Sequence, residues 1–293
     1  MTSAPNAPDS VVHAEMRHVS MHVESGIVLH INRLRGQVLS TRRGAPPALN
    51  DKASMIIAIE SGDISIDTAS LSTLLNRHVF GYRKSPLRKL HARVDGDQLE
   101  LRGDLHKLVW LPFRIRATPS LTQDGMIRVH PTSIRVLGLG VTGFSKSLGG
   151  MSGLLKLEPG HGARTDGDDL LLDPSRMLPP PTIRGRLSSI AVEPGGLRQR
   201  FGASDSTTAT PRGRPGSRAT NYMYFHGGTL QFGKLTMRDS DLEIVDANPG
   251  DPFDYSLDRY LEHLVAGHSN TTMVDGLIVV MPDVGRLKRA DKP

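Results

Sequence analysis

The feature that most constrains this chain is a change of apolar period at a single aspartate within residues 57–80, IAIESGDISIDTASLSTLLNRHVF. Before Asp67 the isoleucines form two pairs spaced by two, Ile57 with Ile59 and Ile64 with Ile66, and a spacing of two is typical of a strand with one buried face. After it the apolar residues recur three or four positions apart, as on one face of an amphipathic helix. Asp67 is suited to cap the helix N-terminus. We therefore expect a strand that leads directly into a helix.

The period-two pattern recurs through the first half of the chain. Two strands are expected within 13–39, with their turn at Ser25 and Gly26. Asp95 and Gly96 form a strong turn signal between strands at 90–94 and 99–105. Further strands at 109–117 and 127–136 extend the antiparallel meander. The predicted fold class is α+β and β-rich.

The second half of the chain mixes strands with weaker helical signals. A second helix is expected over 141–157 and a terminal helix over 251–266, and the predicted strands lie at 170–172, 183–192, 222–225, 229–232, 235–237 and 242–245. The expected organisation is a disordered lead (1–10), a β-rich domain (11–202), a flexible loop (203–219), C-terminal strands and a helix packed on the same domain (220–283), and a charged tail (284–293).

Composition and charge limit the classes of ligand and partner that we expect. The formal charge is +6, which favours an anionic ligand or surface. The basic residues are dispersed and only 4% of residues are aromatic, so we do not expect nucleic acid to be a partner. The absence of cysteine excludes disulfides and thiol catalysis. No apolar run could span a bilayer and the first 25 residues lack a secretory signal, so a cytoplasmic location is expected unless an upstream signal directs the chain to the cell envelope or periplasm.

No pattern of residues predicts catalysis, a metal site or a cofactor. His18 and His22 are four apart, but in a strand they would lie about 13 Å apart, too far to share an ion. The glycines in GLGVTG at 138–143 match a nucleotide-binding fingerprint, but the flanking meander lacks the βαβ unit that this fingerprint requires. We therefore expect a protein that is not an enzyme.

Three segments together resemble the bacterial LmeA-like phospholipid-binding family, which is related in architecture to tubular lipid-binding proteins. They are DTASLSTLLNRHVF, GDQLELRGDLHK and PFRIRATPSLTQDGMIRVHPTSIRVLGLGV, within about residues 55–195. The resemblance implies a curved antiparallel sheet wrapped around a long amphipathic helix, with an apolar groove for acyl chains. It places on the groove Leu71, Leu74, Leu75 and Val79, opposite a wall of Val136, Leu137, Leu139, Val141, Phe144 and Leu148.

The resulting hypothesis is non-enzymatic binding or transfer of a lipid or other amphiphile, with transient contact to a membrane surface. An anionic head group would meet the cations at the groove mouth, Arg83, Lys84, Arg88 or Lys89. The alternative is a structural or envelope-assembly protein that acts through protein contacts. The sequence leaves open whether the apolar faces enclose a groove or a filled core.

Overall fold

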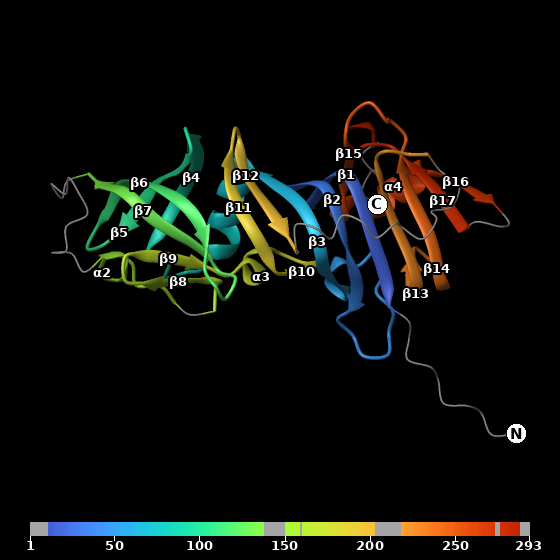
Figure 1. Ribbon diagram of the computed structural model, residues 1–293, viewed down its shortest axis with the longest axis horizontal. Helices are drawn as coiled ribbons and strands as arrows, with labels where there is room; N and C mark the ends of the chain where they lie inside the picture. The colour runs from blue at the N-terminus through green and yellow to red at the C-terminus, as the bar shows by residue number, and fades with distance from the viewer. Residues whose placement is uncertain (1–10, 138–149, 159, 203–217, 273–275, 288–293) are drawn as a thin grey trace, which may run out of the picture.

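The computed structural model describes residues 11–137, 150–158, 160–202, 218–272 and 276–287. Two antiparallel-rich sheets lie side by side along the long axis of an elongated molecule (Figure 1). One contiguous hydrophobic core includes buried residues of both sheets. The prediction of a β-rich chain with curved sheets is confirmed.

The larger sheet has eleven strands and contains the first and the last strand of the chain. Its order is β11-β12-β3-β2-β1-β13-β14-β17-β16, and β10 and β15 pair in parallel with β3 and β1. The strands are β1 (Val12–Glu24), β2 (Ile27–Ser40), β3 (Met55–Asp67), β10 (Thr182–Gly185), β11 (Leu187–Glu193), β12 (Gly196–Phe201), β13 (Tyr222–Phe232), β14 (Leu235–Asp246), β15 (Phe253–Ser256), β16 (His268–Thr272) and β17 (Gly276–Met281).

The smaller sheet has six strands in the order β4-β5-β6-β7-β9-β8. They are β4 (Leu87–Asp95), β5 (Gln98–His106), β6 (Trp110–Leu121), β7 (Ile127–Val136), β8 (Ala163–Asp166) and β9 (Asp169–Leu172). The expected antiparallel meander is confirmed, and its first turn uses Gly96 at φ +67°. A positive φ of this size favours glycine, so the glycine that the turn requires also made the turn predictable from the sequence.

The helices are short. They are α1 (Thr68–Leu74), the π-helical turn η2 (Leu75–Val79), α2 (Gly150–Leu154), α3 (Pro174–Met177) and α4 (Tyr260–Ala266), with 3₁₀ turns η1 (Lys52–Ser54), η5 (Leu257–Arg259) and η6 (Val284–Arg286). The long helix implied by the resemblance does not occur in the described residues. None of the helices in these residues has the length and apolarity needed to cross a membrane.

The predicted change from strand to helix at Asp67 is confirmed. An Asp67 carboxylate oxygen accepts a hydrogen bond from the Ser70 backbone N–H at 2.7 Å, which caps α1. Burial raises the pKa of Asp67, but hydrogen bonds from Ser70 and His30 outweigh it and hold the pKa below its ordinary value. After η2 the chain turns at Gly81, where an added Cβ would lie 2.2 Å from the Arg77 carbonyl oxygen, so this close approach requires glycine.

Three predictions for the C-terminal half are wrong in detail. The four short strands predicted within 222–245 are two long ones, β13 and β14. The terminal helix begins at Tyr260 rather than 251, because Phe253 and Tyr255 belong to β15 and are buried beside β1. Residues 284–286 form η6, where Arg259 donates to the Val284 carbonyl at 3.1 Å, so this part of the predicted charged tail is ordered.

Two further predictions need correction around the middle of the chain. The strand expected over 183–192 is divided at Arg186 into β10 and β11, which pair with different neighbours. Of the helix expected over 141–157, residues 150–157 are described, and there α2 ends at Leu154 rather than at 157; residues 138–149 lie outside the described residues. The predicted lead (1–10) and most of the predicted loop (203–217) also lie outside them.

Candidate functional site

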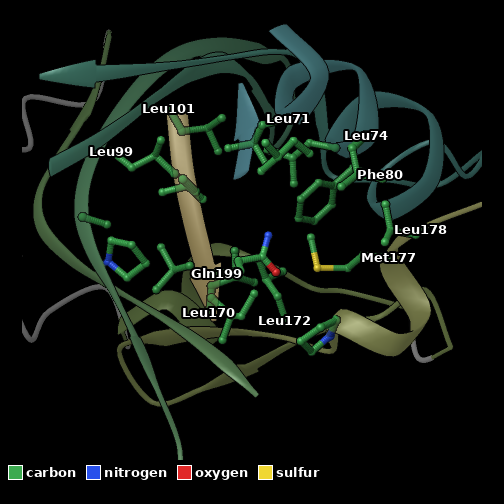
Figure 2. Close-up of a pocket in the computed structure, with 18 of the residues that line it drawn as sticks. Leu71, Leu74, Phe80, Leu99, Leu101, Leu170, Leu172, Met177, Leu178 and Gln199 are labelled. Carbon is green, nitrogen blue, oxygen red and sulfur yellow. The ribbon is translucent and has the colours of Figure 1, made fainter. Parts of the chain in front are cut away.

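A cavity lies between the concave side of the six-stranded sheet, helix α1 and strand β12 (Figure 2). We call it the leucine-rich cavity. Its lining residues are Leu29, Ile66, Leu71, Leu74, Leu75, Phe80, Leu99, Leu101, Ile115, Ala117, Pro119, Ile127, Val129, Met151, Leu170, Leu172, Pro174, Met177, Leu178, Leu197 and Gln199. They come from both sheets, from α1, α2 and α3 and from η2, so the cavity lies where the two sheets and these helices meet.

Asn76 is one of the residues that join the helical wall to the neighbouring strands. Asn76, in η2, donates to the carbonyl oxygens of Ser72 and Leu90, each at 2.7 Å, and accepts from the Leu90 backbone N–H at 2.8 Å. These bonds fasten the π-helical turn to β4. Leu71 and Leu74 on α1, and Phe80 directly after the turn, point toward the cavity, as Figure 2 shows.

The cavity is large for an apolar void. Its empty space is about 980 Å³ when counted out to the solvent, and the centres of water-sized molecules could occupy about 90 Å³ of it. One water needs roughly 10–15 Å³ by the latter measure. About 90 Å³ is therefore room for several waters. The concave side of the smaller sheet is therefore not a fully filled core.

Gln199 is the single polar residue on the lining. It lies on β12, and Figure 2 shows its amide among the side chains that converge on the cavity. Its neighbours on β12 that point the same way include Leu197, another lining residue. No hydrogen bond joins the Gln199 amide to any residue of the described parts of the chain. The cavity thus offers one amide group within an otherwise apolar wall.

The structure places only part of the predicted groove on this lining. Leu71, Leu74 and Leu75 belong to it, whereas Val79 and Val136 are buried in the core without lining it. Leu137 is 72% exposed on the opposite side of the sheet, so its assignment to the groove wall is wrong. The other predicted wall residues, Leu139, Val141, Phe144 and Leu148, lie outside the described residues.

The four predicted head-group cations do not line the cavity. Arg83 and Lys84 are exposed in the turn that follows Phe80. Arg88 and Lys89, on β4, pair with Asp104 at 3.2 and 3.8 Å on the outer side of the sheet. No charged side chain belongs to the lining, so whatever enters the cavity meets apolar surface and one amide.

Several lining residues were not predicted as site residues. Leu170 and Leu172 come from β9, Met177 from α3, and Leu197 with Gln199 from β12. Leu99 and Leu101 lie in the strand that was expected at 99–105, but sequence patterns do not say which buried faces leave space between them.

No family model, curated protein or solved structure matches this chain. The resemblance to the LmeA-like family therefore stays a prediction, and the functional argument depends on the geometry of the cavity.

Proposed function

We propose that the protein binds the apolar chain of a lipid or other amphiphile in the leucine-rich cavity, without catalysing a reaction on it. The observation that carries this proposal is a cavity with about 90 Å³ of space for the centres of water-sized molecules, in which every lining residue but one is apolar. Each methylene group moved from water into such a site contributes about 0.8 kcal/mol. A chain of several methylenes therefore suffices for a stable complex.

The nature of the lining also restricts the ligand. A buried charge without a partner is costly, and no cation or anion lines the cavity. The amide of Gln199 can both donate and accept a hydrogen bond. We therefore expect the buried part of the ligand to carry an uncharged polar group, such as an ester, amide or hydroxyl, at the level of Gln199. A charged head group would remain outside the cavity.

Ala117→Phe tests this proposal directly. Ala117 is buried on β6 and lines the cavity, so a phenyl ring at this position would occupy the space that the ligand needs. We expect uptake of a fluorescent fatty-acid ester to fall at least tenfold, while the melting temperature stays within a few degrees because the ring fills existing space. The matched control is Ala191→Phe, at an exposed position of β11, which leaves uptake unchanged.

Two results would contradict the proposal. One is a wild-type protein that takes up no ester, fatty alcohol or hydrocarbon probe. The other is an A117F variant that is folded and takes up the probe as well as wild type does. Either result would favour the alternative, a structural or assembly protein that acts through protein contacts.

A second variant tests the role of the amide. Gln199→Leu removes the polar group but keeps a similar side-chain size. We expect affinity for an ester-bearing probe to fall about tenfold, in line with the loss of one hydrogen bond in an apolar site, and affinity for a pure hydrocarbon to stay the same or rise. An equal effect on both probes would contradict the assigned role of Gln199.

A further inference from the structure

The turn between β5 and β6 carries apolar side chains into solvent. Leu108 is 96% exposed and Val109 is 61% exposed, and Trp110 begins β6 directly after them. Leu137, 72% exposed, follows β7 and its backbone N–H donates to the Pro112 carbonyl at 2.9 Å, which places it beside the start of β6. We call these four residues the apolar tip.

Cations surround the apolar tip. The Arg88 guanidinium lies 3.9 Å from the centroid of the Trp110 ring, in cation–π geometry. Lys107, in the same turn, donates to the Gly153 carbonyl at 2.9 Å and pairs with no carboxylate of the described residues. An apolar cluster flanked by basic side chains is typical of surfaces that enter the interface of an anionic membrane.

A row of like charges lies behind the tip on the outer face of the sheet. Arg102 on β5 stands directly opposite Arg114 on β6, which stands directly opposite Arg135 on β7. Like charges at such positions are destabilising. We call these three residues the arginine row. Its charge is only partly balanced by carboxylates of the described residues.

Glu100 provides most of that balance. It is fully buried, and its carboxylate lies 2.6 Å from Arg102 and 3.8 Å from Arg114. The same carboxylate also pairs with Arg93 at 2.8 Å and Arg116 at 3.2 Å. One carboxylate thus faces four guanidinium groups. Arg135 is exposed and makes no ion pair in the described parts of the chain, so the row keeps a net positive charge.

The tip and the arginine row share one side of the sheet. Trp110 and Arg114 are four residues apart on β6, so their side chains point the same way and lie about 13 Å apart along the strand. Arg135 and Leu137 are likewise two residues apart. An anionic surface that contacts the tip therefore also meets the row.

We propose that this end of the six-stranded sheet docks on an anionic phospholipid bilayer. Leu108, Val109 and Leu137 enter the bilayer, Trp110 lies at the headgroup level, and the arginine row contacts lipid phosphates. A protruding turn with exposed apolar side chains suits a deformable bilayer, and tryptophan is enriched at membrane interfaces. The proposal goes beyond ligand binding in the cavity because none of these residues lines it.

The chain contains one tryptophan, so its fluorescence reports on the tip alone. The full-length protein is mixed with vesicles of phosphatidylcholine, or of phosphatidylcholine with 30% phosphatidylglycerol as the probe composition. We expect sedimentation with the anionic vesicles only, a blue shift of Trp110 emission, quenching by lipids brominated in their acyl chains, and weaker binding at high salt.

Surface variants identify the contacts. Leu108→Glu with Val109→Glu reduces vesicle binding at least tenfold, and because both side chains are exposed the fold is kept. Arg135→Gln reduces it roughly fivefold, as expected for one cation near an anionic membrane. The matched control is Val265→Glu, at an 85% exposed position on α4 at the other end of the molecule (Figure 1), which binds as wild type does.

The proposal is overturned if the wild-type protein does not bind anionic vesicles, if L108E/V109E binds them equally well, or if the protein binds a soluble polyanion such as heparin but no vesicle. The outcome is independent of the cavity, because L108E/V109E is expected to take up the fluorescent ester normally and A117F to bind vesicles normally. Failure of one proposal is thus distinguishable from failure of the other.

Discussion

Replacement of Glu100 by glutamine tests the electrostatic account of the outer sheet face. The carboxylate is fully buried and accepts hydrogen bonds from Arg102 and Arg116 at 2.6 and 3.2 Å. Glutamine has nearly the same shape, but it offers a single acceptor oxygen and turns an NH₂ group toward the guanidinium groups. The change therefore removes charge and acceptor capacity without leaving a cavity.

The expected loss of stability is about 3 kcal/mol. Hydrogen bonds to charged groups contribute about 1.5–3 kcal/mol each, and two are affected. Solvent reduces the value, because the side chains of Arg102 and Arg116 are 40% and 41% exposed. Repulsion within the arginine row, no longer balanced by Glu100, adds to the loss. Urea unfolding at pH 7 measures the difference.

The dependence on pH provides a second readout. Burial raises the pKa of Glu100, but the hydrogen bonds and charges of the arginines outweigh it and leave the pKa below its ordinary value of 4.5. The stability that the carboxylate contributes is thus fully present above the ordinary pKa and is lost as the pH falls through the lowered one. The difference between wild type and E100Q should be constant from pH 7 to 5 and shrink only in stronger acid.

The control is Glu193→Gln, which alters an exposed carboxylate that pairs with Arg198 at 3.0 Å. Exposed pairs contribute about 0–1 kcal/mol, so this variant is expected to stay close to wild type. An E100Q protein that is as stable as E193Q would refute the reasoning, since it would mean that the four arginines need no buried counter-charge.

Two further predictions concern groups outside the cavity. Burial lowers the pKa of His263 to about 4. The stability of the folded protein is therefore unaffected by this group above the unfolded-state pKa near 6.5, and it falls by about 3 kcal/mol as the pH drops toward 4. We expect this pH dependence, measured by urea unfolding, to disappear in His263→Gln, and an unchanged dependence would contradict the assignment. Asp67→Ala removes the N-cap of α1, and we expect it to lower the free energy of unfolding by about 1 kcal/mol. Asp67→Asn keeps a capping oxygen and is expected to restore most of this loss. An Asp67→Ala protein as stable as wild type would show that packing alone positions the helix.

Local features of the fold were predictable because they depend on neighbouring residues. Asp67 marks the junction of two periodicities and also caps the helix, so pattern and chemistry agree. Gly26 and Gly96 occupy positive φ values that favour glycine, which made both hairpin turns readable. Strand β17 was not among the predicted elements, although the apolar run 277–281 indicates a strand there.

Non-local features were not predictable from one sequence. Phe253 and Leu257 fit a helical spacing, yet Phe253 lies in a strand because β1 has a free edge beside it, more than two hundred residues away in the chain. Leu137 was assigned to the groove through the resemblance, although the alternation from Arg135 already placed it on the outer face. The cavity brings together residues as distant in the sequence as Leu29 and Leu197, and hydrophobic periodicity does not predict such long-range contacts.

The most direct test of the central claim is native mass spectrometry of freshly purified wild type and A117F, followed by solvent extraction and identification of any bound molecule. The account predicts a stoichiometric ligand on the wild type, with an apolar chain and an uncharged polar group, and its loss from A117F. A ligand-free wild type that also takes up no acyl probe would contradict the account and identify the space beneath the six-stranded sheet as an unoccupied packing void.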